Sequence, residues 1–230
     1  MRVTVVQFLG SNCDHDVIQW SKDIFRMPTE VVWYTESDLR KPDLVLLPGG
    51  FSYGDYLRPG AMASRTPAIE SVIDFAKSGG LVLGICNGFQ ILCECGLLPG
   101  ALLRNSSLHF ICRDLYLKAG NKKTPFTNKI PDGKLLRVPI AHGDGNYFCD
   151  EETAKALESE GRVAFRYVSP EGKIDPEWNP NGSMSGIAGI LSEKKNVLGM
   201  MPHPERASDK ALGCEDGRLI FESVISHLES

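Results

Sequence analysis

Short apolar runs alternate with polar stretches over residues 3–95. The runs are rich in Val, Leu and Ile, which is typical of strands buried on both faces of a parallel sheet. Between them, apolar residues recur at helical spacing, and Gly or Pro marks the ends. The pattern predicts strands over 3–8, 30–34, 44–47 and 81–85, helices over 67–78 and 87–95, and a first helix that reaches Phe25 from a cap at Asp14 or Asp16. This alternation predicts an α/β fold with a doubly wound, mostly parallel sheet flanked by helices.

The pattern changes over residues 102–168, where short strands and turns replace the regular alternation. The short strands are expected at 110–112, 115–117 and 135–138, a helix at 151–160, and the two strands of a hairpin at 187–191 and 197–200. The last helix begins near Asp216 and places Phe221, Val224, Ile225 and Leu228 on one face. Because no linker, repeat or low-complexity tract interrupts the chain, residues 1–230 are expected to form one domain.

The strand over 81–85 leads directly into Gly84-Ile85-Cys86-Asn87-Gly88, and a helix follows. A G-x-C-x-G sequence at a strand-to-helix turn is the nucleophile elbow of the hydrolases with sulfur in place of oxygen. The turn strains the backbone of the nucleophile, and the two glycines remove side chains that would collide there. The helix N-terminus favours thiolate over thiol. Cys86 is therefore predicted to be a nucleophile rather than a small residue in a glycine-rich turn.

A candidate base follows the predicted hairpin, within Met201-Pro202-His203-Pro204-Glu205-Arg206. Each proline disfavours helix at the residue before it, so His203 is expected in extended backbone, where positions i and i+2 point to the same side. Glu205 would then bond one imidazole nitrogen and leave the other free to accept the thiol proton. We expect Cys86, His203 and Glu205 to form a catalytic triad, although a surface pair in a rigid turn would have the same local sequence.

Two glycine-rich loops are weaker candidates for the same site. Gly49-Gly50, after the third strand, could offer a backbone N–H to a developing oxyanion together with the N–H of Asn87, or could be a plain turn. His142, in Ala141-His142-Gly143-Asp144-Gly145, could be a second base, a ligand contact or a turn residue. Ligands bind at the carboxyl ends of the strands in doubly wound sheets, so Gly49-Gly50 and Cys86 are expected to face one crevice.

The composition limits which partners and which cellular compartment are expected for the chain. A net charge of −4 without a local Lys/Arg cluster gives no electrostatic footprint for nucleic acid. No apolar run reaches the length of a membrane span, and no signal-peptide pattern begins the chain. The odd number of cysteines, seven, favours reduced thiols in the cytoplasm. No role is assigned to Cys13, Cys93, Cys95, Cys112, Cys149 or Cys214, and Cys13-Asp14-His15-Asp16 is too weak a pattern to predict a metal site.

The sequence GICNGFQ at 84–90, together with MPHPER at 201–206, resembles the class I (triad) glutamine amidotransferases, whose fold is flavodoxin-like. LPGGFSYGDYLRPGA, PIAHGDGNYF and NPNGS are similar to one branch of that family, the glutaminase subunits of phosphoribosylformylglycinamidine synthase in purine biosynthesis. The resemblance runs from QFLGSNCD near the start to PHPER near the end. It departs at Leu9, where the family pattern has proline; this position lies away from the triad motifs.

The resemblance implies that Cys86 attacks the carboxamide of glutamine and that His203 passes a proton to the departing ammonia. Water then releases glutamate from a γ-glutamyl thioester. The implied oxyanion donors are Gly50 and Asn87, and the implied glutamine pocket is lined by Ser52 and Gln90 and closed by the loop that holds His142, Gly143 and Gly145.

The resemblance also implies two protein partners. Ammonia passes to a separate synthetase subunit that uses ATP and Mg, and a small third subunit bridges the two. This chain is expected to hold no cofactor and no metal itself, in agreement with a sequence that lacks the G-x-x-x-x-G-K-[ST] phosphate loop.

Two other functions compete with this interpretation. A stand-alone cysteine hydrolase of the DJ-1/PfpI type would use the elbow cysteine with a different acid, and the intact His203-Pro204-Glu205 argues against it. A non-catalytic scaffold subunit would carry a vestigial triad, whereas all three triad residue types are present here.

Overall fold

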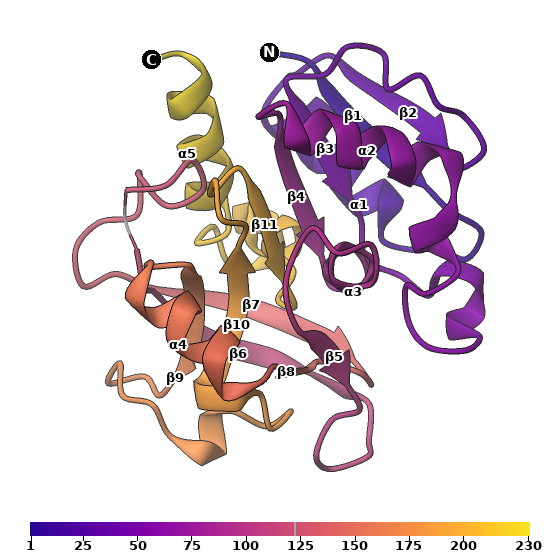
Figure 1. The fold of residues 1–230 in the computed structure, drawn as a ribbon. Coiled ribbons are helices and arrows are strands. Elements are labelled where there is room, and N and C mark those ends of the chain that lie inside the picture. Colours follow the sequence, from indigo (N-terminus) through magenta and orange to yellow (C-terminus); the bar gives the residue numbers. More distant parts are fainter. Residues whose placement is uncertain (122) are drawn as a thin grey trace.

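A nine-stranded sheet forms the centre of the computed structural model, which describes residues 1–121 and 123–230 (Figure 1). The strands lie in the order β2-β1-β3-β4-β11-β10-β9-β6-β7. The first five pair in parallel and have the 2-1-3-4-5 order of flavodoxin-like sheets. From β11 to β7 every neighbouring pair is antiparallel. The predicted α/β fold is confirmed, and the antiparallel part comes from the region where the apolar pattern changes.

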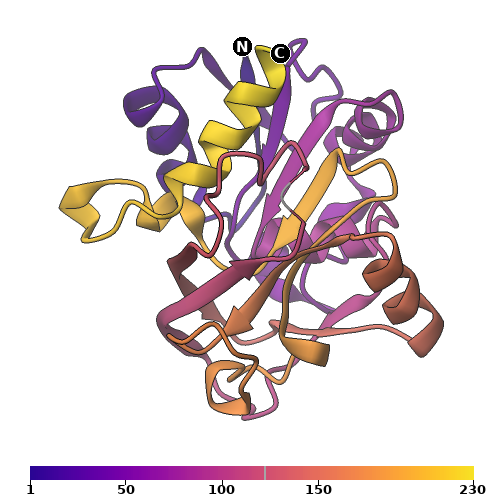
Figure 2. The same cartoon turned by 90° about the vertical axis from the view of Figure 1, so that its left-hand side faces the viewer.

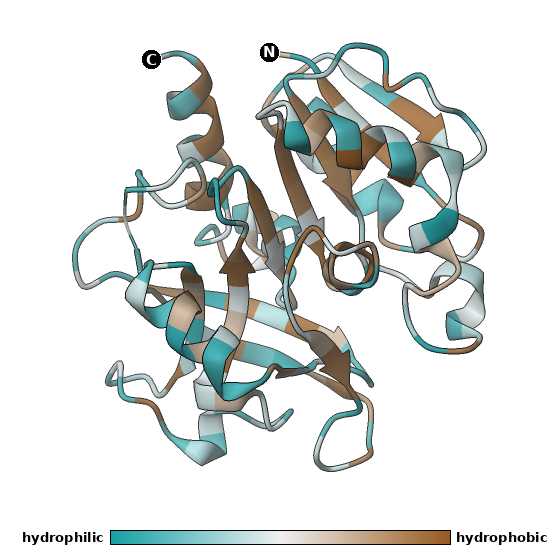
Figure 3. Cartoon of the chain, viewed as in Figure 1, coloured by the Kyte–Doolittle hydropathy of each residue, from teal (hydrophilic) through white to brown (hydrophobic). Residues whose placement is uncertain are grey.

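The parallel strands are covered by helices on both faces. They are β1 (Val3–Gln7), β2 (Thr29–Trp33), β3 (Leu44–Leu47), β4 (Leu81–Ile85) and β11 (Val197–Met200). Every residue of β3, β4 and β11 is buried, as continuous apolar runs require. Figure 2 shows α1 and α5 on one face and α2 and α3 on the other, and Figure 3 shows the apolar strands between them.

The helices begin and end close to the predicted residues. They are α1 (Asp14–Gln19), which continues into the π-helical turn η1 (Trp20–Ile24), α2 (Pro67–Lys77), α3 (Asn87–Glu94), α4 (Glu151–Ser159) and α5 (Arg218–Leu228). Short 3-10 turns are η2 (Ser52–Asp55), η3 (Ala63–Arg65), η4 (Pro176–Trp178), η5 (Met184–Gly186), η6 (Pro204–Ala207) and η7 (Lys210–Leu212). Within the described residues, no helix is long and apolar enough to cross a membrane.

One expectation about the helices is wrong. The N-cap of α1 is Cys13 without a side-chain cap, because Asp14 accepts a hydrogen bond from Gln7 and Asp16 pairs with Arg206. In α5, Phe221 and Val224 of the predicted apolar face are fully buried, and Leu228 is 37% exposed. It lies in the last turn of the helix, beyond the sheet that the earlier turns cover.

The antiparallel strands are β10 (Ile187–Leu191), β9 (Val163–Val168), β6 (Ile111–Ala119) and β7 (Leu135–His142). The predicted β10–β11 hairpin is confirmed. The two short strands expected at 110–112 and 115–117 are one strand, β6, because the exposed Arg113 and Asp114 stay in the ladder with β7. A separate two-stranded sheet joins β5 (Ala101–Leu103) to β8 (Asn146–Phe148). Figure 1 shows β6 and β7 running across the direction of β10 and β11.

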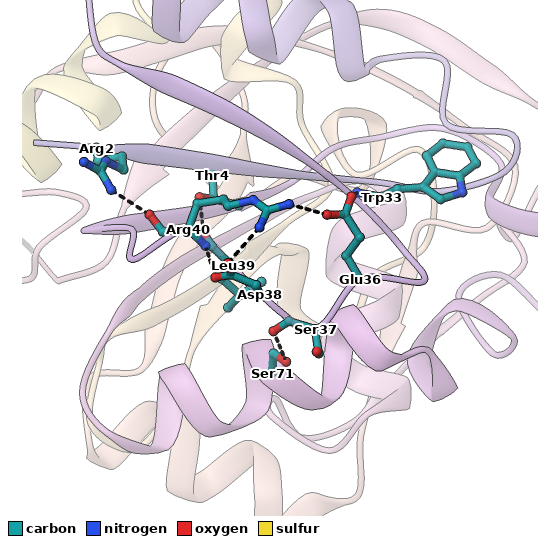
Figure 4. Close-up of polar contacts among 9 residues, drawn as sticks. All are labelled: Arg2, Thr4, Trp33, Glu36, Ser37, Asp38, Leu39, Arg40 and Ser71. Carbon is teal, nitrogen blue, oxygen red and sulfur yellow. Dashed lines mark hydrogen bonds and ion pairs between the residues drawn. The ribbon is translucent and has the colours of Figure 1, made fainter.

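The connection from β2 to β3 contains no helix, unlike the other crossovers of the parallel half. Polar contacts hold this loop against the sheet and α2 instead (Figure 4). Thr4 Oγ1 donates to the carbonyl of Leu39 (2.7 Å), and Ser71 Oγ donates to the carbonyl of Ser37 (2.6 Å). Side-chain hydrogen bonds thus satisfy backbone groups that a helix would pair internally.

Candidate active site

Three neighbouring strands end at the candidate site. Gly49-Gly50 follows β3, Cys86 follows β4, and His203 follows β11. Because these strands are adjacent and parallel, their carboxyl ends meet at one edge of the sheet. Gly50, Cys86 and His203 line one small cavity of about 100 Å³. The structure therefore brings together the predicted nucleophile, the predicted base and one predicted oxyanion donor.

Cys86 has the backbone conformation that the elbow motif predicts. Its φ of 50° and ψ of −105° lie outside the regions that residues with side chains ordinarily adopt. A Cβ on Gly84 would lie 2.7 Å from the backbone of Gly88, and one on Gly88 would lie 2.1 Å from the carbonyl oxygen of Leu47. The two glycines are thus required because α3 starts in direct contact with β3 and β4.

His203 and Glu205 form a buried pair beside the cavity. The imidazole Nδ1 lies 2.6 Å from Glu205 Oε1, and both residues are at most 2% exposed. The backbone N–H of His203 donates to the carbonyl of Pro139 in β7 (2.8 Å), which fixes the chain there. His203 Nε2 is buried and has no hydrogen-bond partner within residues 1–121 and 123–230. A surface pair in a rigid turn is therefore excluded, and the imidazole is oriented by Glu205.

Burial and neighbouring charges together determine the protonation of the two histidines. Burial lowers the pKa of His203, but the negative charges of Glu205 and of a Cys86 thiolate, with the hydrogen bond to Glu205, outweigh burial and raise this pKa to about 10. Burial, together with the charge of His203, lowers the pKa of His142 to about 3. At neutral pH His203 is thus a cation next to the nucleophile, and His142 is neutral.

The Gly49-Gly50 turn is more than a plain turn. A Cβ on Gly49 would lie 2.7 Å from His203 Cε1, and one on Gly50 would lie 2.8 Å from the backbone nitrogen of Asn12. Gly50 also has a φ of +143°. Gly50 forms an isolated antiparallel β-bridge with Ser11, which lies in the loop after β1. Close approach to His203 and to the loop after β1 explains both glycines.

Ser52, Asn87 and Gln90 form a chain of hydrogen bonds next to the cavity. The Ser52 N–H donates to Asn87 Oδ1 (3.2 Å), Asn87 Nδ2 donates to Gln90 Oε1 (2.9 Å), and Gln90 Nε2 donates to the carbonyl of Asp144 (2.7 Å). The side chains therefore link the turn after β3, the start of α3 and the loop after β7. They do not line the 100 Å³ cavity itself; their contact with glutamine stays a prediction.

Asn105 organises the loop that holds His142, Gly143 and Gly145, and sequence reasoning missed it. It is fully buried; its Nδ2 donates to the carbonyls of His109 and His142, while its Oδ1 accepts from the Gly145 N–H (3.0 Å) and lies 3.1 Å from His142 Nδ1. The two carbonyl partners fix the amide orientation, so His142 carries its proton on Nδ1. Its buried Nε2 is then a free acceptor without a partner in the described chain.

The glycines of this loop differ in what they require. A Cβ on Gly145 would lie 2.1 Å from the His142 ring, so the loop closes over the imidazole only with glycine at this position. A Cβ on Gly143 would have no neighbour within 4 Å. Packing thus explains Gly145, and nothing in the structure demands glycine at Gly143.

Cys13 and Arg206 also line the cavity, although the motifs did not indicate them. Arg206 Nη2 lies 3.0 Å from Cys13 Sγ, and its Nε lies 3.0 Å from Asp16 Oδ2. Burial is the main cause that raises the pKa of Cys13 to about 12. Cys13 and Asp16 thus serve as partners of Arg206, and in the described part of the chain no group of three or more His, Cys, Asp or Glu residues is placed to hold a metal ion.

The chain is similar to known proteins over nearly its whole length. The model of the CobB/CobQ-like glutamine amidotransferase domain matches residues 1–213. The chain is 50% identical over 227 residues to phosphoribosylformylglycinamidine synthase subunit PurQ of Salinibacter ruber, covering 99% of this chain and 97% of that protein. It is 50% identical over 226 residues to the PurQ subunit of Aquifex aeolicus, covering 98% and 100%.

Solved structures show the same relationship. PurLQS from Thermotoga maritima contains a chain that matches with a TM-score of 0.87 and 44% identity, over 99% of this chain and 98% of that one. A second glutamine amidotransferase of Thermotoga maritima matches with a TM-score of 0.55 at 18% identity, over 97% and 90%, and shares the fold.

Proposed function

The chain belongs to the CobB/CobQ-like glutamine amidotransferase family, and we propose that it is the glutaminase subunit of a phosphoribosylformylglycinamidine synthase. It releases ammonia from glutamine for the conversion of formylglycinamide ribonucleotide to formylglycinamidine ribonucleotide in purine biosynthesis. The observation that carries the proposal is the meeting of Cys86 and the His203–Glu205 pair at one cavity. Identity of about half the positions over nearly the whole length of PurQ subunits supports the pathway.

The first half of the reaction forms a thioester. The Cys86 thiolate attacks the side-chain carbonyl carbon of glutamine, and the carbonyl electron pair moves onto oxygen. The N–H groups of Gly50 and Asn87 stabilise that oxyanion. As the C–N bond breaks, the His203 cation donates its proton to the departing nitrogen, and ammonia leaves. A histidine held as a cation by Glu205 suits this step, because it stabilises the thiolate first and then acts as general acid.

The second half releases glutamate. Neutral His203 now accepts a proton from water, and the hydroxide attacks the thioester carbonyl. Collapse of the second oxyanion breaks the C–S bond and returns Cys86 as thiolate beside protonated His203. Glu205 keeps Nδ1 protonated throughout, so that Nε2 serves both transfers.

Two partners and a location belong to the proposal. The solved PurLQS assembly contains a relative of this chain. By analogy, the ammonia passes to an ATP- and Mg-dependent synthetase subunit, a small third subunit bridges the two, and this chain binds no cofactor of its own. A cytoplasmic location fits the seven cysteines, all of which are unpaired.

The test is glutamine-dependent synthesis in the complex reconstituted with the synthetase and the small subunit. Cys86→Ala should abolish glutamate release and glutamine-dependent product formation. Added ammonium chloride should restore product formation, because the synthetase remains intact. Cys112→Ala, which removes an exposed thiol in β6, is the matched control and should behave as the unmodified chain.

The outcomes separate the competing functions. Full glutamine-dependent synthesis by Cys86→Ala would refute the proposal. Equal glutamate release by the unmodified chain with and without the partners would support a stand-alone cysteine hydrolase. Failure of a diazoketone analogue of glutamine to label Cys86 in the assembled complex would support a scaffold subunit with an inactive triad.

A further inference from the structure

The turn η2, which follows Gly49-Gly50 closely in the chain, contains an unusual carboxylate, Asp55. Three consecutive residues, Tyr53, Gly54 and Asp55, have φ values of 55°, 65° and 55°. The left-handed region costs residues with side chains about 1–2 kcal/mol each. Asp55 Oδ1 is buried and has no hydrogen-bond partner within the described residues, and Asp55 forms no ion pair there. The fold thus strains its backbone to hold a buried, uncompensated oxygen.

The environment of Asp55 also disfavours its charge. Burial is the largest cause and the negative charge of Asp144 the second, and together they raise the pKa of Asp55 to about 6. Asp144 itself has a cation nearby, since Arg104 Nε lies 3.9 Å from its Oδ1. Asp55 is therefore the carboxylate of this pair that still lacks a cationic partner in the described chain. An arriving cation would relieve both the desolvation and the repulsion.

The position of Asp55 relates it to the glutamine pocket. Ser52 begins the same turn and is joined through Asn87 and Gln90 to the backbone of Asp144. Asn87 and Gln90 stand in the first turn of α3, immediately after the nucleophile. Ser52 is only 2% exposed, and its hydroxyl also has no partner among the described residues. The turn that holds the unpartnered Ser52 hydroxyl and Asp55 carboxylate is thus connected by hydrogen bonds to the helix start that follows Cys86.

We propose that Asp55 binds the α-ammonium group of the substrate glutamine, with the charge of Asp144 beside it. The proposal rests on the glutaminase function above. It extends that function by explaining how the site selects glutamine over other carboxamide substrates. Glutamine differs from simple carboxamides by its α-amino and α-carboxylate groups, and an anionic acceptor selects the ammonium. When no substrate is bound, Asp55 lowers the stability of the fold, as functional residues often do.

The experiment compares two substrates in the reconstituted complex: glutamine and 4-carbamoylbutanoate, which is glutamine without its α-amino group. Ammonia release is measured for the unmodified chain, for Asp55→Asn and for Asp144→Asn. Asp55→Asn should lower kcat/KM for glutamine about 10- to 100-fold, mostly through KM, which is the range for loss of a charged hydrogen bond. The value for 4-carbamoylbutanoate should stay unchanged. Asp144→Asn should show the same selectivity with a smaller effect. Asp74→Asn, an exposed carboxylate on α2, is the control and should change neither value.

Further measurements distinguish a binding role from a structural one. The rate at which iodoacetamide alkylates Cys86 should be equal in Asp55→Asn and the unmodified chain. Tm should be unchanged or higher, since a half-buried carboxylate whose Oδ1 has no partner in the described chain has been removed. An equal fall of kcat/KM for both substrates, or no fall for glutamine, would overturn the proposal. Failure of the glutaminase function would show itself separately, as absence of glutamine hydrolysis by the unmodified complex.

Discussion

Gly88→Ala is expected to inactivate the protein through geometry alone, since it removes no reactive group. The new Cβ would lie 2.1 Å from the carbonyl oxygen of Leu47, and real Cβ contacts essentially never fall below 3.0 Å. The backbone of α3 must therefore shift away from β3 by at least about 0.9 Å, the difference between these distances. Cys86 is the N-cap of α3 and shifts with it. A displacement of about 1 Å at a reacting group costs on the order of 10² in rate.

The assay for Gly88→Ala is glutamate release in the reconstituted complex, with Tm measured on the same preparation. Overpacking should cost about 1–3 kcal/mol of stability, so a control must be comparably destabilised far from the site. Gly133→Ala is suitable because Gly133 has a φ of +74° and no neighbour within 4 Å of a new Cβ. It should lose about 1–2 kcal/mol through backbone strain alone and retain full activity.

The comparison can refute the reasoning about the elbow. A folded Gly88→Ala protein with unchanged kcat would show that the start of α3 does not set the position of the nucleophile. An equal loss of activity in Gly133→Ala would assign the effect to stability instead. If only Gly88→Ala loses activity and iodoacetamide still reacts with Cys86, the thiol is accessible. The defect then lies in the alignment of Cys86 with the other groups of the site.

Three further predictions concern buried polar groups. Glu205→Gln should lower kcat on the order of 10²-fold or more and move the alkaline limb of the pH–rate profile to lower pH, because the charge that raises the pKa of His203 is lost; an unmoved limb in the measured profile would contradict this. Asn105→Ala should lower glutaminase activity with retained Cys86 alkylation, because the loop after β7 loses its central partner; unchanged kcat/KM would contradict it. Asn196→Ala removes the two hydrogen bonds that Asn196 Nδ2 donates to the carbonyls of Ala76 and Gly80 at the opposite end of the sheet, so it should cost about 1–3 kcal/mol by denaturant unfolding and spare kcat; no loss would show that water replaces the amide.

The parallel half of the fold could be predicted because its strands are buried on both faces. A strand such as β3, with four consecutive buried aliphatic residues, stands out from its surroundings without knowledge of its neighbours. The ends of α3 were equally visible, because Gly96 follows with a φ of +79° and the helix cannot continue through it. In β6, by contrast, three successive exposed residues hide a continuous strand. Its existence depends on pairing with β7 and β9, which no local pattern reveals.

The residues of the candidate site also differ in whether the sequence alone predicts them. Cys86 and the His203–Glu205 pair lie in motifs whose chemistry can be stated from spacing alone. Asn105 lies in an ordinary polar loop, 37 positions before His142, and its role depends on the return of β7 to the same place. Asp55 lies within the SYGDYLR motif, but its missing partner becomes visible only once burial is known. Local sequence thus indicates reactive groups, and tertiary structure is needed to find the residues that orient them.

The antiparallel half belongs to the active site as much as the parallel half does. β7 is the last strand of the sheet, so one of its edges has no strand to pair with. In an antiparallel sheet, the N–H and C=O groups of one residue point to the same edge of its strand. The backbone groups of the residue two positions further on point to that edge as well. Pro139 and Ala141 are two positions apart in β7. The Pro139 carbonyl accepts a hydrogen bond from the His203 N–H, and the Ala141 carbonyl oxygen lies 3.8 Å from Cys86 Sγ. Pro139 lacks an N–H, which is tolerated at an edge and would break a ladder elsewhere. This edge of β7 therefore contacts the predicted base and the predicted nucleophile where another sheet would hold a strand, and a one-residue slip of β7 would remove both contacts together.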